Sequence, residues 1–598
     1  MVIASRTRAS KKTDAAAPAA LSDNGMTHRE VLTALSGLLL GMFVSMLAST
    51  VVGTSLPLII SDLKGDQGAF TWVVTATLLA TTVSTPIWGK LADLFNRKLL
   101  LQIALVIFVL ASAIAGFAQD PGTLITMRVF QGLGAGGLAA LSQIVMADII
   151  SPRERGRYAG LFGAVMAVAT VGGPLLGGVI TDGLGWRWNF FVGLPIAVVA
   201  LVLLQRTLHL PKRPKTKVSI DYVGIVLISA GVSLLLLWVT FAGNDFDWIS
   251  MPSLLMAGGA ALLLIVAVVV ELRVKEPVIP LGLFKNRTFT LSVVASLSVG
   301  VAMFGTAVFL SQYMQLARGA TPTESGLLTI PMMAGVLIAS TVIGALVSRR
   351  GKWKAFMVTG GVLMVVGSVL LSQLQYDTPF WFVGIAMFVL GAGVGMLMQN
   401  LVLVVQNTTA VKNMGVATSA VTFVRSLGGT IGVAVMGSIL GTVAAEHIKN
   451  GIAGLEPEQQ AEAAKTLAGG VIPQISELPE FLRVVVESAY GVGVGSTFLA
   501  AVPLAIVTLI AVIFLPNVGL GTQTAIQRAK SEQGEDAAAA TVADERTRER
   551  EDAEDAAIDA AAASVALVPV GLAYDPATGA VDPVEVSSTS SRERSRDE

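Results

Sequence analysis

Five charged residues stand where their charge could do chemistry rather than keep the chain in solution. Asp93 and Arg97 lie four residues apart in the run GKLADLFNRK, which joins two apolar stretches, and Asp148 lies at the end of another such stretch. Arg128 and Arg425 lie inside apolar stretches whose middle thirds contain no acidic residue. A charge in such surroundings is costly and points to function, and a carboxylate whose surroundings change can take up and release a proton.

Several other kinds of chemistry lack the residues they need. The 598 residues include no Cys, and the three histidines (His28, His209 and His447) lie far apart in polar stretches, so we expect no metal site. No GxxxxGK[ST] loop is present, and the run GLGAGG (132–137) lies inside an apolar stretch instead of after a strand. The net charge of zero and the lack of a binding motif argue against nucleic-acid binding, and no grouping of nucleophile, base and metal predicts an enzyme.

The elements that must position these residues are apolar stretches long enough to cross a membrane. Hydrophobic residues make up 53% of the chain and charged residues 14%, against about 25% charged in an average soluble domain. A spanning helix needs about 20 mostly apolar residues, and we count fourteen such stretches, which predicts an all-α polytopic membrane protein. The expected spans are 32–56, 70–91, 99–118, 123–147, 158–181, 189–208, 220–242, 253–272, 289–314, 325–347, 355–374, 380–405, 415–442 and 489–515.

The basic residues give the expected orientation, because short cytoplasmic loops carry an excess of Lys and Arg. With the N-terminus inside, the inner loops hold 25 of the 41 basic side chains and the outer loops hold 6. The first 25 residues are basic and polar without an apolar core, so they do not resemble a cleavable signal peptide. We therefore expect a multi-pass protein of the plasma membrane with both termini in the cytoplasm.

An internal repeat divides the chain. The run GKLADLFNRK (89–98) aligns with GALVSRRGKWK (344–354) at an offset of 255 residues, which indicates two related six-helix bundles around a central cavity. The outer segment 443–488 contains an amphipathic run at 479–487, so it is expected to be partly helical and to lie along the membrane surface. The expected parts are a disordered cytoplasmic N-terminal tail (1–30), an N-terminal six-helix bundle (31–208), a linker with two inserted spans (209–286), a C-terminal six-helix bundle that includes an outer loop at 443–488 (287–515) and a disordered acidic cytoplasmic tail (516–598).

Three motifs are similar to those of a known family. GKLADLFNRK is similar to the loop motif GxLaDrxGrk, RVFQGLGAGG to the fourth-span motif RxxqGxgaa, and GGPLLGG to the fifth-span antiporter motif GPxxGG. With the runs WRWNFFVGLP and EPVIPLGLFKNRTF, they make residues 30–515 resemble the major facilitator superfamily, and within it the 14-span drug:proton antiporters of the EmrB/QacA type. The matching positions are Gly89, Asp93, Arg97 and Lys98; Arg128, Gln131 and Gly132; and Gly173, Pro174, Gly177 and Gly178.

The resemblance implies a major facilitator fold of two six-helix bundles with two inserted helices. In this family the halves rock to open a cavity to each side in turn, with no bound cofactor and with the proton gradient as energy source. The resemblance further implies that Asp93 and Arg97 form a gating latch between the halves. The GPxxGG segment would form a flexible and closely packed seam, since Pro removes a helix hydrogen bond and Gly removes side chains.

Departures from the family pattern limit what can be carried over. The run LASTVVGTSLP has Ala48 in place of the usual Asp, which the family uses as a proton or cation site, and Asn96 stands in place of a usual Gly. The proton-linked candidates that remain are Asp93 and Asp148. Because Asp148 lies at the end of its span, pairing with an arginine of the following run SPRERG explains it more simply.

Polar and aromatic side chains inside the spans are the candidates for a substrate cavity. If Arg425 faces the cavity, it should attract anionic or neutral lipophilic compounds and disfavour permanent cations; otherwise it only joins helices. Arg128 lies five residues from the outer end of its span, so we expect it to reach outward and to be structural. The cavity candidates are Ser45, Ser49, Thr50, Phe304, Gln312, Tyr313, Gln399, Asn400 and Arg425.

The sequence therefore predicts a monomeric exporter of lipophilic compounds, including drugs, that meets small substrates and membrane lipids but no nucleic acid. A second hypothesis keeps the fold and assigns it to an endogenous lipid, siderophore or metabolite, exported or facilitated without a proton site in the first span. A third hypothesis is a receptor or scaffold that displays the acidic tail, which carries 17 acidic and 8 basic residues. A receptor, however, has no need of two repeat halves with an antiporter seam.

Overall fold

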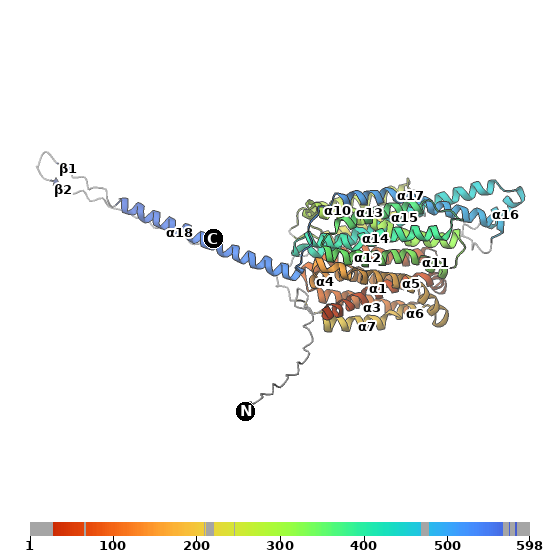
Figure 1. Ribbon diagram of the computed structural model, residues 1–598, viewed down its shortest axis with the longest axis horizontal. Helices are drawn as coiled ribbons and strands as arrows, with labels where there is room; N and C mark the ends of the chain where they lie inside the picture. Colours follow the sequence, from red (N-terminus) through yellow and green to blue (C-terminus); the bar gives the residue numbers. More distant parts are fainter. Residues whose placement is uncertain are drawn as a thin grey trace, which may run out of the picture. The chain divides into compact units, whose positions relative to one another are not determined.

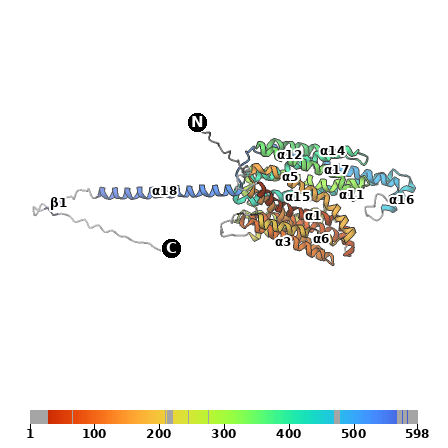
Figure 2. The ribbon, with the colours of Figure 1, turned by 60° about the horizontal axis from the view of Figure 1, so that its bottom comes forward.

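Long helices dominate the computed structural model, which describes residues 28–64, 67–208, 210, 221–243, 246–274, 276–467, 478–565, 573–574 and 581–582. The chain forms two units, Met1–Arg528 and Ala529–Glu598. In the first unit the long helices lie side by side along one common direction, which Figure 1 and the turned view of Figure 2 both show. This arrangement suits helices that cross a membrane together.

Nine helices precede residue 272 in the described part of the chain. They are α1 (His28–Asp62), α2 (Gln67–Leu94), α3 (Arg97–Gly116), α4 (Pro121–Ile149), α5 (Pro152–Leu184), α6 (Trp188–Phe191), α7 (Gly193–Thr207), α8 (Tyr222–Phe241) and α9 (Met251–Glu271). We call α1–α7 the N-terminal helix group. The helices α8 and α9 correspond to the two inserted spans.

The remaining elements follow the inserted pair. They are η1 (Leu281–Lys285), α10 (Arg287–Gln312), the π-helical turn η2 (Tyr313–Ala317), α11 (Pro322–Leu328), α12 (Ile330–Arg350), α13 (Lys354–Leu371), α14 (Phe380–Thr408), η3 (Val411–Asn413), α15 (Met414–Ala453), α16 (Pro457–Leu467), α17 (Glu480–Ile513), α18 (Ala525–Val565), β1 (Ala573–Tyr574) and β2 (Val581–Asp582). We call α10–α17 the C-terminal helix group. The strands β1 and β2 pair antiparallel in the second unit.

The chain is a multi-pass membrane protein. Within the described residues, 13 helices are long and apolar enough to cross a membrane. They account for every expected span except 70–91, which lies in α2. The sequence of this 28-residue helix contains six Thr, and the side chains of residues 67, 68, 70 and 71 lie outside the described part of the chain.

Helices occupy most of the expected outer loop 443–488, which the sequence predicts to be partly helical. Helix α15 continues to Ala453, and α17 begins at Glu480, so the amphipathic run 479–487 is the first part of a long helix instead of a separate surface helix. Leu482 and Val486 explain the amphipathic pattern, since they pack with Ala463 of α16 in a small apolar cluster. Residues 468–477 lie outside the described part of the chain.

The predicted disorder of the tail is wrong over part of its length, since α18 spans 41 residues there. Its sequence is rich in Ala, Glu and Arg, which favour helix even when no apolar face is buried. Residues 1–27, most of the predicted N-terminal tail, lie outside the described part of the chain, as do most residues after 565.

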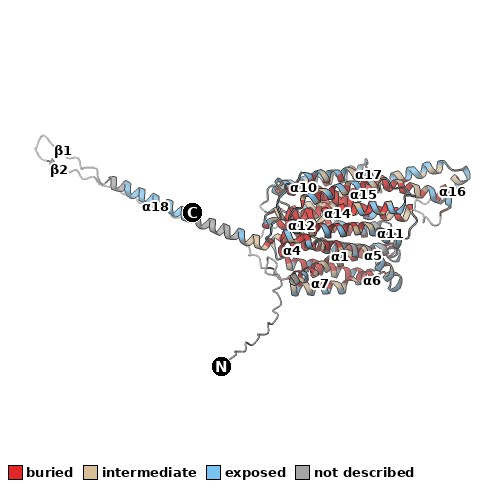
Figure 3. Cartoon of the chain, viewed as in Figure 1, coloured by how far each residue is buried: buried red, intermediate tan, exposed pale blue. Residues whose placement is uncertain are grey.

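The apolar core divides by sequence. One large cluster takes its members from residues 31–208, and another from residues 295–515. Figure 3 shows buried residues concentrated along helices such as α14 and α15, while α16 is largely exposed. Each helix group therefore has a large apolar cluster of its own.

The inserted helix α8 packs against one helix from each group. Val232 and Leu236 of α8 form a cluster with Val83 of α2 and Phe423 of α15. At one end Phe241 lies 5.9 Å from Trp72, measured between ring centroids. At the other end Glu276, which follows α9, forms a 2.7 Å ion pair with Lys90 of α2. These contacts hold α8 and the segment after α9 against α2, from one end of α2 to the other.

Candidate functional site

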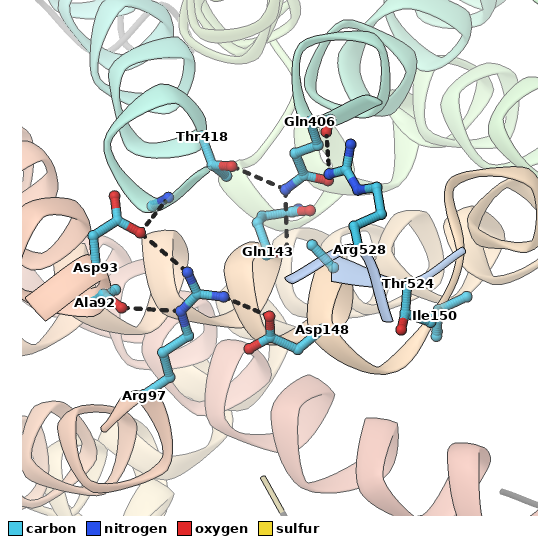
Figure 4. Close-up of polar contacts among 12 residues, drawn as sticks. Ala92, Asp93, Arg97, Gln143, Asp148, Ile150, Gln406, Thr418, Thr524 and Arg528 are labelled. Atoms are coloured by element: carbon cyan, nitrogen blue, oxygen red, sulfur yellow. Dashed lines mark hydrogen bonds and ion pairs between the residues drawn. The ribbon is translucent and has the colours of Figure 1, made fainter. Parts of the chain in front are cut away.

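The two helix groups meet at the end of the assembly where α2 and α4 end and α3, α5 and α15 begin. We call this the Asp93 end, and the end that carries Asp62 the opposite end. At the Asp93 end, Figure 4 shows the guanidinium of Arg97 lying between the carboxylates of Asp93 and Asp148. All three side chains are almost fully buried, with exposed fractions of 2%, 5% and 8%.

Asp93 connects the two helix groups directly. Its Oδ1 accepts a hydrogen bond from the backbone N–H of Gly415 at 2.8 Å, and its Oδ2 accepts one from the N–H of Val416 at 2.9 Å. Both N–H groups belong to the first turn of α15, where unpaired donors and the helix dipole favour a negative charge. The carboxylate of α2 therefore caps a helix of the other group.

Arg97 joins this cap to Asp148. It donates from Nη2 to Asp93 Oδ1 at 3.1 Å, from Nη1 to Asp148 Oδ1 at 2.5 Å and from Nε to the carbonyl of Ala92 at 3.0 Å. The expectation that Asp148 pairs with Arg153 or Arg155 is wrong, because the start of α3 brings Arg97 closer. Two carboxylates thus share one guanidinium in a buried place, an arrangement that a proton or a separation of the helices would disrupt.

The other residues of the loop motif support the network without joining it. Lys98 donates from Nζ to the carbonyl of Gln205 at 2.8 Å, on the side of α7. Asn96, which stands where the family has Gly, is the N-cap of α3 and accepts from the N–H groups of Lys98 and Leu99. This cap holds the first turn of α3, which carries Arg97.

A cluster of amide side chains forms a second connection between the groups. Gln406 of α14 donates from Nε2 to the carbonyl of Gln143 at 3.2 Å and to Thr418 Oγ1 at 3.0 Å, and its Oε1 accepts from Arg155. Gln143 also donates to Gln399 Oε1 at 3.3 Å. The three glutamines and Arg155 line a narrow cavity of about 20 Å³. Sequence reasoning missed Gln143 and Gln406, although amides inside apolar spans were a usable signal.

The predicted substrate residues do not all converge on one place. Gln399 and Asn400 line the narrow cavity, and Asn400 donates to its own helix at the carbonyl of Met396. Tyr313 is fully buried and donates to the carbonyl of Gln375 at 2.6 Å, so its hydroxyl holds a loop. Phe304 packs against Gly429 inside the C-terminal helix group.

The remaining candidates on α1 and α10 differ in exposure. Thr50 donates to the carbonyl of Ala169 on α5 at 3.0 Å, while Ser45 is half-buried and Ser49 is exposed. Gln312 is half-buried, and its Oε1 has no hydrogen-bond partner among the described residues. These side chains belong to α1 and α10, and they do not line one common cavity.

Arg425 is buried and has spare hydrogen-bonding capacity. Its Nη2 donates to the carbonyl of Met398 at 2.9 Å, which joins α15 to α14. Its Nε has no partner among the described residues, and no carboxylate lies within 4.0 Å there. Arg425 therefore joins helices and could also offer a donor to an anionic or polar group.

Arg128 has a structural role within the N-terminal helix group. It is only 5% exposed, so the expectation that it reaches outward is wrong. It donates to the carbonyl of Val73 at 3.3 Å and to Gln131 Oε1 at 3.1 Å, and Gln131 donates to Ser112 at 2.7 Å. Gly132 allows this close packing, because a Cβ there would lie 2.5 Å from the carbonyl oxygen of Thr77. The fourth-span motif thus holds α4 against α2 and α3.

The antiporter motif lies in the middle of α5. At Gly173 an added Cβ would overlap the hydroxyl of Thr50, so this glycine lets α5 approach α1 closely, and Gly177 is buried. At Gly178 an added Cβ would meet nothing within 4 Å. The side chain of Pro174 lies outside the described part of the chain. The motif thus packs mainly within the N-terminal helix group.

A closer approach between the groups lies at the Asp93 end of α5. A Cβ at Gly156 would overlap the carbonyl oxygen of Gly344 on α12, and a Cβ at Gly415 would lie 2.5 Å from the carbonyl oxygen of Gly89. Two glycine pairs therefore bring α5 against α12 and α2 against α15. Backbone atoms form these contacts, so a side chain cannot move aside to admit a larger residue.

We expect Gly156→Ala to open the Asp93 end. The added methyl group must push α5 from α12, at a cost of about 1 to 3 kcal/mol for the closed arrangement. Because the chain has no Cys, a Val402→Cys variant at the buried lining of the narrow cavity reports opening by its rate of maleimide labelling. Labelling should rise by about tenfold.

Gly172→Ala is the matched control for that experiment. It lies on the same helix, gains the same helix propensity, and its Cβ would meet nothing within 4 Å. Equal labelling of the two variants would contradict the interpretation of Gly156 as a contact point between the helix groups.

The opposite end carries a separate network within the N-terminal helix group. Asp62 accepts hydrogen bonds from Trp186 Nε1 at 2.9 Å and from Arg187 Nη1 at 3.1 Å, which lower the pKa of its carboxyl. Asn189 donates to Ser55 at 2.7 Å. These contacts give the WRWN run a structural role, because they fasten α1 to the segment that joins α5 and α7. In the described part of the chain, no cluster of His, Asp and Glu could hold a metal ion.

Comparisons with known proteins place this geometry in context. The sequence profile of the Major Facilitator Superfamily matches residues 38–433. An uncharacterized MFS-type transporter of Mycobacterium tuberculosis (strain H37Rv) is 36% identical over 81% of this chain and 69% of its own length. The Multidrug transporter protein MdtP of Bacillus subtilis (strain 168) is 36% identical over 70% of this chain and 77% of its own length. Multidrug resistance protein 3 of the same organism is 30% identical over 72% and 84%.

Solved structures share the fold. The human organic anion transporter MFSD10 superposes with a TM-score of 0.51 at 13% identity, over 79% of this chain and 99% of its own length. The proton:xylose symporter XylE, bound to 6-bromo-6-deoxy-D-glucose, gives a TM-score of 0.51 at 13% identity, over 84% and 99%. Both are transporters with helices arranged as in this chain.

Proposed function

Because this chain belongs to the major facilitator superfamily, we propose that it exports small lipophilic compounds from the cytoplasm as a 14-span drug:proton antiporter of the plasma membrane. The observation that carries the proposal is the capping of α15 by Asp93 of α2 across the two helix groups. Export proceeds by alternating access of the two groups, in a monomer and with the proton gradient in place of a cofactor. The Asp93 end faces the cytoplasm in this proposal, since the predicted inner loops lie there.

The contacts between the groups support alternating access. Asp93, the amide cluster around Gln406 and the two glycine pairs all lie toward the Asp93 end. Polar contacts and bare backbone can separate and re-form without exposing a large apolar core, whereas each group keeps a core of its own. The state described here is therefore closed toward the proposed cytoplasmic side, and opening breaks these contacts together.

The shared arginine supports a link to protons. When Asp93 and Asp148 are both ionised, they balance one guanidinium and one helix N-terminus, and the closure is strongest. A proton on either carboxylate weakens the closure and favours opening toward the cytoplasm. Release of that proton inside lets the network re-form after substrate has bound, so proton entry and substrate export alternate.

The substrate preference follows from the charges inside the helices. Relatives of this chain are named multidrug transporter and multidrug resistance proteins, which supports lipophilic substrates. Ala48 is 7% exposed and belongs to an apolar cluster, so the expected span 32–56 within α1 offers no carboxylate to a cation. With Arg425 as a buried charge that has a spare donor, neutral or anionic lipophiles are preferred over permanent cations. The lack of a carboxylate at position 48 also favours the alternative of a dedicated exporter for one endogenous lipid, siderophore or metabolite.

Everted membrane vesicles that hold a proton gradient test this proposal. Adding a neutral or anionic lipophilic dye should release protons from the vesicles, and tetraphenylphosphonium, a permanent cation, should release few. Export that continues unchanged after an uncoupler would contradict proton antiport. Vesicles that respond to none of the dyes but do respond to a lipid extract of the producing cells would favour the dedicated exporter.

A further inference from the structure

An open pocket lies at the Asp93 end, apart from the Asp93 network and the narrow cavity. It encloses about 1100 Å³ of empty space, part of which is solvent. Its lining comes from the start of α5, the end of α12 and the segment before α18, which contributes Thr522. Both helix groups and the chain that leaves α17 therefore meet around one pocket.

Three arginines give this pocket an excess of positive charge. Arg153 and Arg157 project from α5 one turn apart, and Arg349 projects from the end of α12. All three are exposed, and no carboxylate lies within 4.0 Å of them among the described residues. The one acidic lining residue, Glu154, accepts a hydrogen bond from Ser151 at 3.5 Å. The lining thus carries two uncompensated positive charges.

The chemistry of this lining suits phosphate. Guanidinium groups bind phosphate oxygens in pairs of parallel hydrogen bonds, and three of them can surround one group from two sides. The hydroxyl of Thr522 adds a possible donor at the wall. Basic pockets between membrane helices on the cytoplasmic side are a known setting for the headgroups of anionic lipids.

Hydrogen bonds to the backbone of Arg153 hold the walls of the pocket together. The hydroxyl of Ser348 on α12 donates to the carbonyl of Arg153 on α5. The N–H of Arg153 donates to the carbonyl of Gly521 at 3.2 Å. Below these contacts Gly156 lies against Gly344. An anion in the pocket would therefore bind three chain segments that must separate when the Asp93 end opens.

We propose that this pocket binds a phosphate-bearing anion, and that the bound anion holds the Asp93 end closed. The source of the phosphate is the headgroup of an anionic lipid or free phosphate in the cytoplasm, which share the chemistry that the arginines recognise. The site is distinct from the transport route in Proposed function, since its residues take no part in the Asp93 network or the narrow cavity. It makes the rate of export depend on the anions at the membrane surface.

The test uses the full-length protein in nanodiscs and the triple variant R153Q/R157Q/R349Q. Nanodiscs of phosphatidylcholine are compared with nanodiscs that also contain phosphatidylglycerol, and inorganic phosphate is titrated into the phosphatidylcholine sample. The measured quantities are the thermal unfolding midpoint and the labelling rate of Val402→Cys. With the three arginines intact, phosphatidylglycerol or phosphate should raise the midpoint and, in the Val402→Cys background, slow labelling. Each arginine contributes about fivefold to anion binding, so the triple variant should bind roughly a hundredfold more weakly.

The matched control is the triple variant R206Q/R273Q/K412Q, which removes the same charge from exposed residues outside the pocket. It should respond like the wild type. A response to phosphatidylglycerol alone assigns the site to lipid headgroups, and an equal response to inorganic phosphate assigns it to free phosphate. An equal loss of response in both triple variants, or no response in the wild type, would overturn the proposal. Size-exclusion profiles establish that each variant is folded.

Discussion

Replacing Asp93 with asparagine should reduce export by roughly thirtyfold while leaving the protein folded. The neutral amide can accept only one of the two N–H groups of Gly415 and Val416, and it loses the attraction of the helix dipole and of Arg97. Hydrogen bonds to charged groups contribute about 2 kcal/mol each, which sets this magnitude for the balance between closed and open states. Export of a lipophilic dye and labelling of Val402→Cys measure the two consequences, a slower cycle and a more open Asp93 end.

Asp120→Asn is the matched control. Asp120 also caps a helix, since it accepts from the N–H of Thr123 at 2.8 Å at the start of α4. It lies at the opposite end, is exposed, and connects no residues of different groups. Export should stay near the wild-type level in this variant. If Asp93→Asn exported normally with unchanged labelling, the carboxylate would be no more than a local cap, and the gating role would fail.

Truncating the chain after Asn517 should be far more harmful than truncating it after Arg528. The short segment 518–528 holds the loops of the Asp93 end through its carbonyls, its amides and one arginine. Gly519 and Gly521 bond to the side chain of Asn407, and Arg528 donates to the carbonyls of Asn407 and Gln406. Trp353 donates to the carbonyl of Val518 at 2.7 Å. At about 1 kcal/mol for each of these five bonds, the loss of even two of them should lower export by about tenfold or more.

The two truncations form a matched pair. Both remove residues 529–598, including most of the acidic helix α18, and only one removes the segment that bonds to Asn407. The thermal unfolding midpoint should fall for the shorter chain alone. Loss of function in both truncations would instead assign an essential role to the acidic tail, as the receptor hypothesis requires. Normal export by both would leave the segment without a role in closure.

The helices could be predicted because each one must satisfy its own backbone in hydrocarbon and bury apolar surface. Thirteen of the fourteen expected stretches correspond to helices apolar enough to span, and the remaining one is the Thr-rich α2. The errors lie where helices leave the apolar layer. At residue 525 a helix begins in polar sequence that hydropathy does not mark. At residue 480 the amphipathic run is visible, but not its continuation into the last span as one helix.

The candidate site could be predicted only in part. The loop motif singled out Asp93 and Arg97, and the sequence also marked Asp148 as a charge at a helix end. The pairing of Asp148 with Arg97 depends on how α3 and α4 pack, which spacing along the chain does not contain. The same holds for Gln406, whose partners come from residues more than 200 positions away and from the next helix. Polar contacts between distant segments are decided by packing, and a single sequence does not reveal packing.

Because α8 packs on one side of the two helix groups, the two sides of the protein present different surfaces to the lipid. On one flank α8 covers the junction of α2 and α15, with Leu236 buried between them. Elsewhere α5 packs directly against α12, and both helices carry exposed apolar side chains, Val168 on α5 and Ile338 on α12. If the lipophilic substrates of the proposed function enter sideways from the bilayer, we expect them to enter on the side of α5 and α12 and not on the side that α8 covers.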